Sequence, residues 1–282
     1  MQARENVLKL PPLMHGGKKY TPLPGEDILD FSVNCNPYGA PPGIKGVIKN
    51  TTIDDYPDTE STQLRKALAY KFGLEIGNIL AGNGSTEIIR LIASAYIDSG
   101  DKVFILQPTY SDYEIACRIM NAEIRFLPAS AETNFYFNTD TIISQIQHEH
   151  PRAVFICNPN NPTGQYLGQD DIARLLQANP QALLILDEAY IAFTTHAWAP
   201  YKLLHAGNLI VIRSMTKDYA LAGIRIGYAI SSGQIISALN KVKPPWNVSS
   251  LAQSCGLSAL QHDEYVRNCG RKIQKAKKYL TG

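Results

Sequence analysis

Short apolar runs alternate with helical stretches from residue 61 onwards, and this alternation is the feature that most constrains the fold. Several runs are apolar throughout, as in Val154–Cys157 and Leu183–Leu186. Unbroken apolar runs are typical of strands that are covered on both faces, and helical crossovers between such strands favour a parallel sheet. The sequence therefore predicts an α/β fold, with three α/β/α layers around a mostly parallel sheet.

The pattern along the chain predicts where these elements lie. Strands are predicted at Lys102–Leu106, Glu123–Leu127, Ala153–Cys157, Ala182–Leu186, Asn208–Ile212 and Arg225–Ile230. Helices are predicted near residues 61–72, 86–99, 111–121, 139–148, 168–178, 249–261 and 263–280. Ser61 is expected to cap the first of these helices. Residues 1–60 are rich in Pro, Gly, Asn and Asp, which indicates an extended arm with turns.

Composition excludes several classes of protein. The 282 residues are 45% apolar and 18% charged, with a formal net charge of +2, so we expect a globular chain that does not bind nucleic acid. No apolar run approaches the ~18 residues that span a bilayer, and the N-terminus lacks a signal-peptide core, so no membrane contact is expected. The five cysteines form no CxxC pair, which argues against zinc and disulfides. We therefore expect a cytoplasmic protein without a metal.

Polar groups follow the predicted strands at the end where open α/β sheets bind ligands. Asp187 follows one strand directly, and a buried carboxylate there needs a partner, either a structural cation or a protonated ring nitrogen. Lys217 follows another strand and is either a surface lysine or an amine that forms an imine with a carbonyl. Asn158–Gly164, after a third strand, is a Pro/Asn/Gly turn that could also present its asparagines to a ligand.

A second group of residues suits a phosphate. Gly82–Glu87 lies where a turn enters a helix, and the free N–H groups of a helix N-terminus bind anions. It is not a P-loop, because no GK[ST] follows. Ser214, Thr216 and Arg225 add two hydroxyls and a guanidinium. With Tyr110 as an aromatic ring that could stack, the set suits pyridoxal 5′-phosphate.

The ordered motifs also resemble those of the fold-type I, class I/II aminotransferase family. They are GNGSTE, PTY, NPNNPTG, DEAY, SMTK and GIRIGY, and they cover nearly the whole chain. The resemblance implies an aspartate-aminotransferase-like fold, pyridoxal 5′-phosphate as the cofactor, and a homodimer.

The resemblance assigns roles to individual residues. Lys217 would hold the cofactor covalently, and Asp187 would pair with the nitrogen of the cofactor ring. Asn161 and Tyr190 would both hydrogen-bond the phenolic oxygen of that ring. Lys217, Asp187 and Tyr190 are the expected catalytic residues. Tyr110 and Ala189 would lie on the two ring faces. The phosphate would be held by Gly84, Ser85, Thr86, Ser214, Thr216 and Arg225, together with Tyr56 donated to the neighbouring subunit.

Two members of the family compete as models for the reaction. His15-Gly16-Gly17, Asp30–Pro37 and Pro245–Val248 are more similar to threonine-phosphate decarboxylase, of cobalamin synthesis, whereas Tyr110 is more typical of histidinol-phosphate aminotransferase, of histidine synthesis. The decarboxylase is therefore the first expectation and the aminotransferase the alternative. The substrate would be a small amino acid or amine phosphate ester, held by His15, Gly16, Asn34 and Asn161.

The resemblance also implies a division of the chain. Residues 1–50 would be an N-terminal arm, 51–262 the large cofactor-binding domain, and 263–282 a helix leading into a small domain. Relatives continue beyond this helix, so we expect an incomplete small domain that lacks the arginines that bind the substrate carboxylate. On this expectation the chain binds the cofactor but is a poor catalyst, and a truncated, non-catalytic homologue is a third alternative.

Overall fold

One seven-stranded sheet organises the described residues of this computed structural model, which are 1–10, 16 and 30–281. Its spatial order is β1 (Ile79–Gly82), β7 (Gly227–Ser231), β6 (Leu209–Ser214), β5 (Leu183–Asp187), β4 (Ala153–Cys157), β2 (Lys102–Gln107) and β3 (Glu123–Pro128). β7 is antiparallel to both of its neighbours, and every other pair is parallel. The predicted mostly parallel sheet is confirmed.

The strand directions decide which residues can meet at one edge of the sheet. Because β7 runs against both β1 and β6, those two strands run the same way as β2, β4 and β5. The carboxyl ends of these strands and the amino end of β7 therefore lie along one edge. Register agrees with this, since Gly227 at the start of β7 pairs with Gly82 and with Ser214 at the ends of its neighbours.

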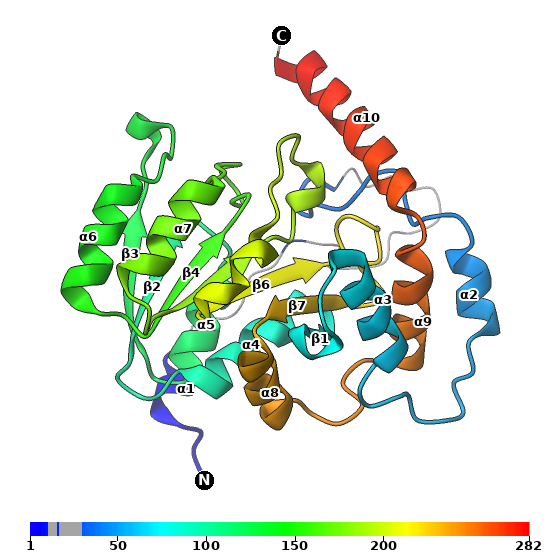
Figure 1. The fold of residues 1–282 in the computed structure, drawn as a ribbon, viewed down its shortest axis with the longest axis horizontal. Helices are drawn as coiled ribbons and strands as arrows, with labels where there is room; N and C mark the ends of the chain where they lie inside the picture. Colours follow the sequence, from blue (N-terminus) through cyan, green and yellow to red (C-terminus); the bar gives the residue numbers. More distant parts are fainter. Residues whose placement is uncertain (11–15, 17–29, 282) are drawn as a thin grey trace.

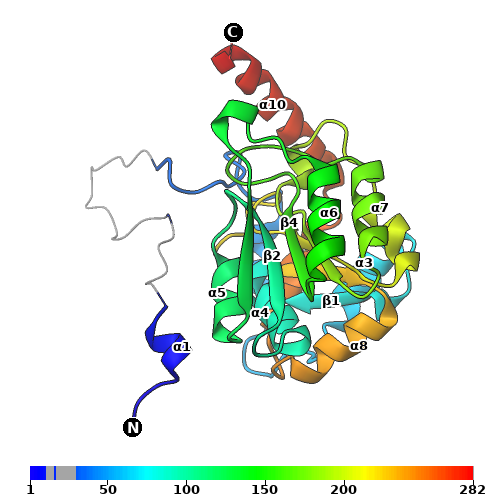
Figure 2. The ribbon, with the colours of Figure 1, turned by 90° about the vertical axis from the view of Figure 1, so that its left-hand side faces the viewer.

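Helices cover both faces of the sheet and make the three layers. One face carries α4 (Gly84–Tyr96), α5 (Asp112–Ile119) and α8 (Gly233–Val242). The other carries α3 (Thr62–Phe72), α6 (Thr139–Glu149), α7 (Gln169–Ala178) and α9 (Ser250–Ala259). Figure 2 shows α4 and α5 on one side of β2 and β4, with α6 and α7 on the other. Short 3₁₀ segments lie at Ile76–Asn78, Ala131–Thr133, Ile191–Phe193 and Pro200–Ala206.

Side chains of the central strands alternate between two buried clusters. In β2, Val103 and Ile105 pack under α4 and α5, whereas Phe104 and Leu106 pack in the cluster on the opposite face. Each strand must therefore be apolar on both sides, and this explains the unbroken apolar runs of the sequence. Burying these side chains contributes about 25 cal/mol per Å² of apolar surface removed from water.

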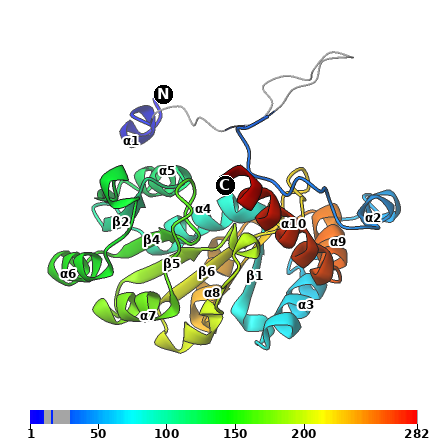
Figure 3. The same ribbon diagram turned by 90° about the horizontal axis from the view of Figure 1, so that it is seen from above.

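The N-terminal region contains more helix than the sequence predicts. α1 (Glu5–Leu8) contacts α5, and the Asn6 amide donates to the carbonyls of Arg118 and Ile119 at 3.0 and 2.9 Å. α2 (Ile44–Asn50) packs against α9 at one end of the molecule (Figure 3). The prediction of an extended arm with turns is therefore wrong for these two segments, which are helical.

The cap of α3 also differs from its prediction. Ser61 is buried with φ at 48° and makes no capping hydrogen bond through its side chain. Asp58 serves instead, because its carboxylate accepts from the backbone N–H groups of Glu60 and Thr62 at 2.9 and 2.7 Å. A carboxylate at this position also complements the helix dipole.

The last described helix, α10 (Asp263–Thr281), confirms the prediction of a helix over residues 263–280. It extends away from the sheet towards the C-terminus in Figure 1. Its middle part packs against the 3₁₀ segment Ile191–Phe193, and the Gln274 amide donates to the Phe193 carbonyl at 2.8 Å. Across the described ranges, no helix combines the length and the hydrophobicity that crossing a bilayer requires.

Gly227 provides a test of how tightly β7 packs against the start of α4. A Cβ at this position would lie 2.8 Å from the Ser85 backbone nitrogen and 2.9 Å from the Arg213 carbonyl oxygen. Because backbone atoms cannot move aside cheaply, we expect Gly227→Ala to lower the free energy of unfolding by about 1–3 kcal/mol. Urea unfolding measures the change.

The matched control is Gly223→Ala, where a Cβ would meet nothing within 4 Å. This substitution should change the free energy of unfolding by less than about 0.5 kcal/mol. Equal stability of the two variants would contradict the close packing of β7 on α4.

Candidate active site

A cavity of about 990 Å³ opens at the edge where the strand ends meet. It gathers residues from segments that lie far apart in the sequence. The predicted site residues that line it are Gly16, Asn34, Ser85, Thr86, Tyr110, Asn161, Asp187, Ala189, Tyr190, Thr216, Lys217 and Arg225. Gly84 and Ser214 do not line the cavity, but they lie against two lining residues, Arg225 and Thr216. The structure therefore brings together nearly all of the residues that the motifs singled out.

Asp187 is the last residue of β5 and is only 3% exposed. The Tyr113 hydroxyl donates to one carboxylate oxygen at 2.8 Å, and the Ala189 N–H donates to the other at 3.0 Å. Burial raises the pKa of Asp187 to about 6, although these hydrogen bonds and the Lys217 charge act in the opposite direction. A cation within the cavity would favour the ionised carboxylate.

The neighbouring carboxylate, Glu188, belongs to a structural ion pair. Its Oε2 accepts from Nε and a terminal nitrogen of Arg213 at 2.8 and 2.7 Å, and the Arg213 guanidinium lies over the Phe72 ring at 5.3 Å. Glu188 does not line the cavity, whereas Asp187 does. The sequence left open whether a buried carboxylate here pairs with a structural cation or with a ligand. Glu188 pairs with a structural cation, whereas Asp187 faces the cavity in which a ligand could bind.

Lys217 lies in the turn that connects β6 to β7. The turn begins where the Met215 N–H donates to the Ile226 carbonyl at 3.1 Å. The Lys217 side chain lines the cavity together with Asp187. An amine and a carboxylate therefore share one partly enclosed space, and this is the arrangement required by a ligand that has both a carbonyl and a basic nitrogen.

The opposite end of the cavity suits an anion. Ser85 and Thr86 lie in the first turn of α4, where backbone N–H groups have no helical acceptor. A Cβ on Gly84 would lie 2.6 Å from a terminal nitrogen of Arg225, so only glycine lets that guanidinium approach the helix end. The Ser214 and Thr216 hydroxyls are 2.7 Å apart on the same side. A phosphate fits this set of donors.

A flat ring fits between the two ends. Tyr110 meets Tyr113 edge to face at 5.6 Å, and its hydroxyl is 3.4 Å from the Thr86 hydroxyl. Across the cavity, the Asn161 amide donates to the Tyr190 hydroxyl at 3.3 Å, and burial raises the pKa of that phenol. The donor set matches the pyridoxal phosphate that the sequence predicts.

The arm supplies one wall of the cavity. Gly16 and Asn34 line it, and the Asn34 amide lies 3.5 Å from the Asn161 side-chain oxygen. His15, the third residue of the arm that is predicted to contact substrate, lies outside the described residues. Two of the predicted substrate residues therefore line the side of the cavity nearest the arm, together with Ser32 and Val33.

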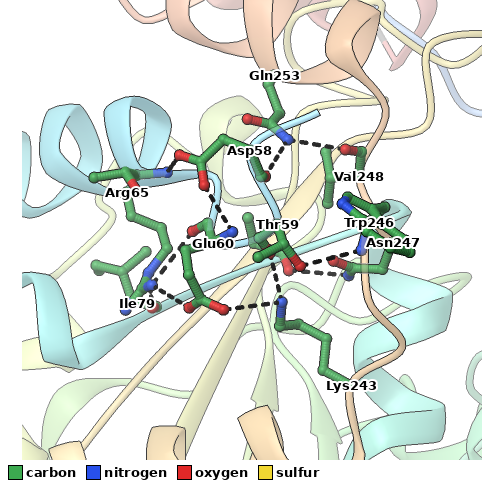
Figure 4. A network of polar contacts seen from close by, with 12 residues as sticks. Asp58, Thr59, Glu60, Arg65, Ile79, Lys243, Trp246, Asn247, Val248 and Gln253 are labelled. Carbon is green, nitrogen blue, oxygen red and sulfur yellow. Dashed lines mark hydrogen bonds and ion pairs between the residues drawn. The ribbon is translucent and has the colours of Figure 1, made fainter. Parts of the chain in front are cut away.

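Tyr56 differs from the other described site residues, because it neither lines the cavity of its own chain nor stacks on a residue that does. Its ring is 80% exposed and stacks on Trp246 with centroids 4.4 Å apart. Figure 4 shows how the segment after Tyr56 is held: Lys243 donates to the Thr59 carbonyl at 2.8 Å, and Gln253 donates to the Asp58 carbonyl at 2.8 Å.

Sequence reasoning missed two residues that support the site. Tyr113 is fully buried and donates to Asp187, and the spacing Tyr110-x-x-Tyr113 at a helix start could have indicated it. Asn36 is also buried, and its backbone N–H donates to the Lys217 carbonyl at 3.0 Å. Nothing in the pattern around Asn36 indicates that contact, since the partners are 181 positions apart in the sequence.

The fold and the cavity define a class of protein, and comparison with known proteins agrees. Residues 26–282 match the family model "Aminotransferase class I and II", and the chain belongs to this family. It is therefore an aminotransferase-family enzyme that depends on pyridoxal 5′-phosphate, as predicted.

Several individual proteins are similar to this chain. The chain is 34% identical to the histidinol-phosphate aminotransferase of Ruminiclostridium cellulolyticum, over 85% of this chain and 68% of that protein. A solved histidinol-phosphate aminotransferase of Clostridium acetobutylicum matches with a TM-score of 0.79 and 31% identity, over 89% of this chain and 75% of that one. L-threonine-O-3-phosphate decarboxylase of Porphyromonas gingivalis matches with a TM-score of 0.74 and 28% identity, over 84% and 70%.

The raised pKa of Asp187 gives a prediction for the cofactor-free chain. Its folded pKa of about 6 exceeds the ~3.9 of an unfolded aspartate, so the folded state binds a proton more tightly between these values. The wild type should therefore lose stability as the pH rises through this window. Asp187→Asn should be more stable than the wild type by about 1–3 kcal/mol at pH ~7.5 and should lose this advantage near pH ~4.

Urea unfolding of the cofactor-free proteins at the two pH values measures this difference. Asp54→Asn is the control, because Asp54 is exposed and its substitution should change stability little at either pH. An Asp187→Asn variant that is less stable than the wild type at the higher pH would show that burial does not penalise this carboxylate.

Proposed function

We propose that this chain is an aminotransferase that acts on histidinol phosphate. The observation that carries the proposal is the 34% identity to a histidinol-phosphate aminotransferase over 85% of the chain, combined with a cavity that has an amine, a buried carboxylate and an anion site. The sequence alone favoured threonine-phosphate decarboxylase, and the comparisons favour its alternative. Cytoplasmic location and a role in histidine synthesis belong to the same proposal.

The residue roles that we propose follow the geometry of the cavity. Lys217 binds the cofactor covalently, and Asp187 pairs with its ring nitrogen. Asn161 and Tyr190 donate to its phenolic oxygen, while Tyr110 and Ala189 flank the ring. Gly84, Ser85, Thr86, Ser214, Thr216 and Arg225 hold its phosphate. Gly16, Asn34 and Asn161 contact the substrate, with His15 as a further candidate.

When bound, the cofactor supplies an electron sink for negative charge at the substrate α-carbon. The chain's own residues do the rest. The Asp187 carboxylate would be ionised when a positively charged nitrogen lies opposite it, and it would stabilise the charge on that nitrogen. The Lys217 amine would move a proton at the substrate α-carbon. Tyr110 and Ala189 keep the reacting groups between two walls, from which bulk water is partly excluded.

The division of the chain that the sequence predicts is part of this proposal. We take residues 1–50 as the arm, 51–262 as the cofactor-binding domain and 263–282 as a connecting helix. The cofactor ligands assigned to this subunit lie between Gly84 and Arg225, which is within the second part. The arm contributes Gly16 and Asn34 to the same cavity.

The reaction is tested by supplying the loaded protein with histidinol phosphate and 2-oxoglutarate. We expect glutamate to form only when both substrates are present. Lys217→Ala should retain a weakly bound cofactor but slow turnover by about 10²–10⁴-fold or more, because the amine that moves the proton is lost. Borohydride should trap cofactor on the wild type and not on the variant. Trapping at another lysine would contradict the assignment.

The second candidate is threonine-phosphate decarboxylase, which is favoured by the 28% identity of a solved structure and by the sequence around Gly16 and Trp246. O-phospho-L-threonine is therefore assayed beside histidinol phosphate. Release of carbon dioxide and aminopropanol phosphate, without glutamate formation, would replace the aminotransferase with the decarboxylase.

We further propose a homodimer in which Tyr56 completes the phosphate site of the partner subunit. Three observations support this: its ring is exposed, it is stacked on Trp246, and it lies outside the cavity of its own chain. Twofold dimers are the commonest assemblies, and a residue exchanged across the axis would serve both sites.

Subunit mixing tests this arrangement. Tyr56→Ala and Lys217→Ala should each be poorly active alone. After unfolding and refolding together, mixed dimers would contain one intact site, with Lys217 from one subunit and Tyr56 from the other. About a quarter of wild-type activity should return for random pairing. No recovery in dimers that light scattering and mass spectrometry show to be mixed would place Tyr56 outside the partner's site.

A further inference from the structure

The arm crosses over the turn that carries Lys217, and one buried residue makes the contact. Asn36 is 4% exposed, although its neighbours Phe31–Asn34 are exposed and Cys35 is partly exposed. A polar side chain buried in this way must satisfy its hydrogen bonds inside the protein. Its bonds therefore show what the arm is attached to.

Asn36 binds two consecutive peptide carbonyls of the lysine turn. Its backbone N–H donates to the Lys217 carbonyl at 3.0 Å, and its side-chain amide donates to the Asp218 carbonyl at 3.0 Å. Its side-chain oxygen accepts from the Tyr38 N–H at 3.1 Å, which closes a turn within the arm. An asparagine supplies both a donor and an acceptor at this side-chain length, and neither alanine nor aspartate supplies both.

The same stretch of the arm reaches the substrate side of the cavity. Asn34, two residues earlier, lines the cavity and lies 3.5 Å from the Asn161 oxygen. A second attachment holds the other end of the stretch, because the Tyr265 hydroxyl on α10 lies 2.7 Å from the Tyr38 carbonyl oxygen and 3.0 Å from that of Gly39. Asn36 is thus placed between the cavity wall and an anchor on the last helix.

We propose that Asn36 is a positioning residue for Lys217. It fixes the peptide units of residues 217 and 218 against the arm, so that the Lys217 amine keeps a constant position relative to the wall of the cavity that the arm forms. The proposal rests on the proposed function only in taking Lys217 as the cofactor-binding residue. Asn36 does not line the cavity, so it acts through Lys217 and not on a ligand.

Amide hydrogen exchange on the cofactor-free chain tests the contact without any reaction. In Asn36→Ala, the N–H of residue 36 should exchange about 3–10-fold faster than in the wild type, because losing the side-chain bond loosens the carbonyls it binds. The Tyr38 N–H should also exchange faster, because its acceptor is removed.

Asn36→Asp separates the two bonds of the side chain. Aspartate can still accept from the Tyr38 N–H but cannot donate to the Asp218 carbonyl. We expect Tyr38 to stay protected in this variant, while the N–H of residue 36 exchanges as fast as in Asn36→Ala. Wild-type exchange at residue 36 in both variants would overturn the proposal.

The loaded protein provides a second readout, which is the pH at which the absorbance of the lysine-bound cofactor changes. In the wild type the fixed turn keeps the Lys217 nitrogen in the cavity that it shares with Asp187, whereas a loosened turn should let the nitrogen move away from that negative charge. The midpoint should fall by about 0.5–1 pH unit in Asn36→Ala, which is the size of one lost hydrogen bond.

The matched control is Tyr265→Phe, which releases the arm from α10 but leaves the bonds to the lysine turn intact. Its midpoint should equal that of the wild type. An equal shift in Tyr265→Phe, or no shift in Asn36→Ala, would show that Asn36 only holds the arm down. If the wild type carries no lysine-bound cofactor, the proposed function fails, whereas the exchange experiment still decides the role of Asn36.

Discussion

The site depends on a carboxylate that is placed where water cannot solvate it well. Asp187 ends a strand with buried neighbours on both faces, and it is accepted there because Tyr113 and the Ala189 N–H satisfy its oxygens. The unfavourable burial of this charge is reduced by any cation that enters the cavity. The end of β5 thus favours a ligand with a positively charged nitrogen at one end of the cavity. The start of α4 favours an anionic group at the opposite end of the cavity.

Much of this arrangement could be predicted from the sequence because strand ends are easy to find when strands are buried. β2, β4 and β5 are unbroken apolar runs, and the polar residues that follow them meet at one edge for topological reasons alone. β1 was missed because four residues between two turns carry no period. α8 was also missed, although Ile235, Ile236 and Leu239 have the spacing of a helix face.

What the sequence could not supply are contacts that depend on the third dimension. The bond from Tyr113 to Asp187 requires that α5 start beneath the end of β5, and the bond from Asn36 to Lys217 joins residues whose proximity follows from no local pattern. The same limit explains the choice between the two reactions. The motifs predict the cofactor, which both reactions share. The choice between the reactions depends on how the substrate is oriented, and similarity to whole proteins was needed to favour one of them.

Arg225 precedes its strand, while the other polar groups at the edge follow theirs, because β7 alone is reversed. The residues of the site therefore come from many short segments, which are spread along the chain from the arm to the start of β7. Contacts of such long sequence separation form late and slowly during folding. A ligand that needs all of these segments together stabilises the native state and not partly folded forms. We therefore expect a newly made chain to fold before the cofactor binds. The bound cofactor should then stabilise the native state.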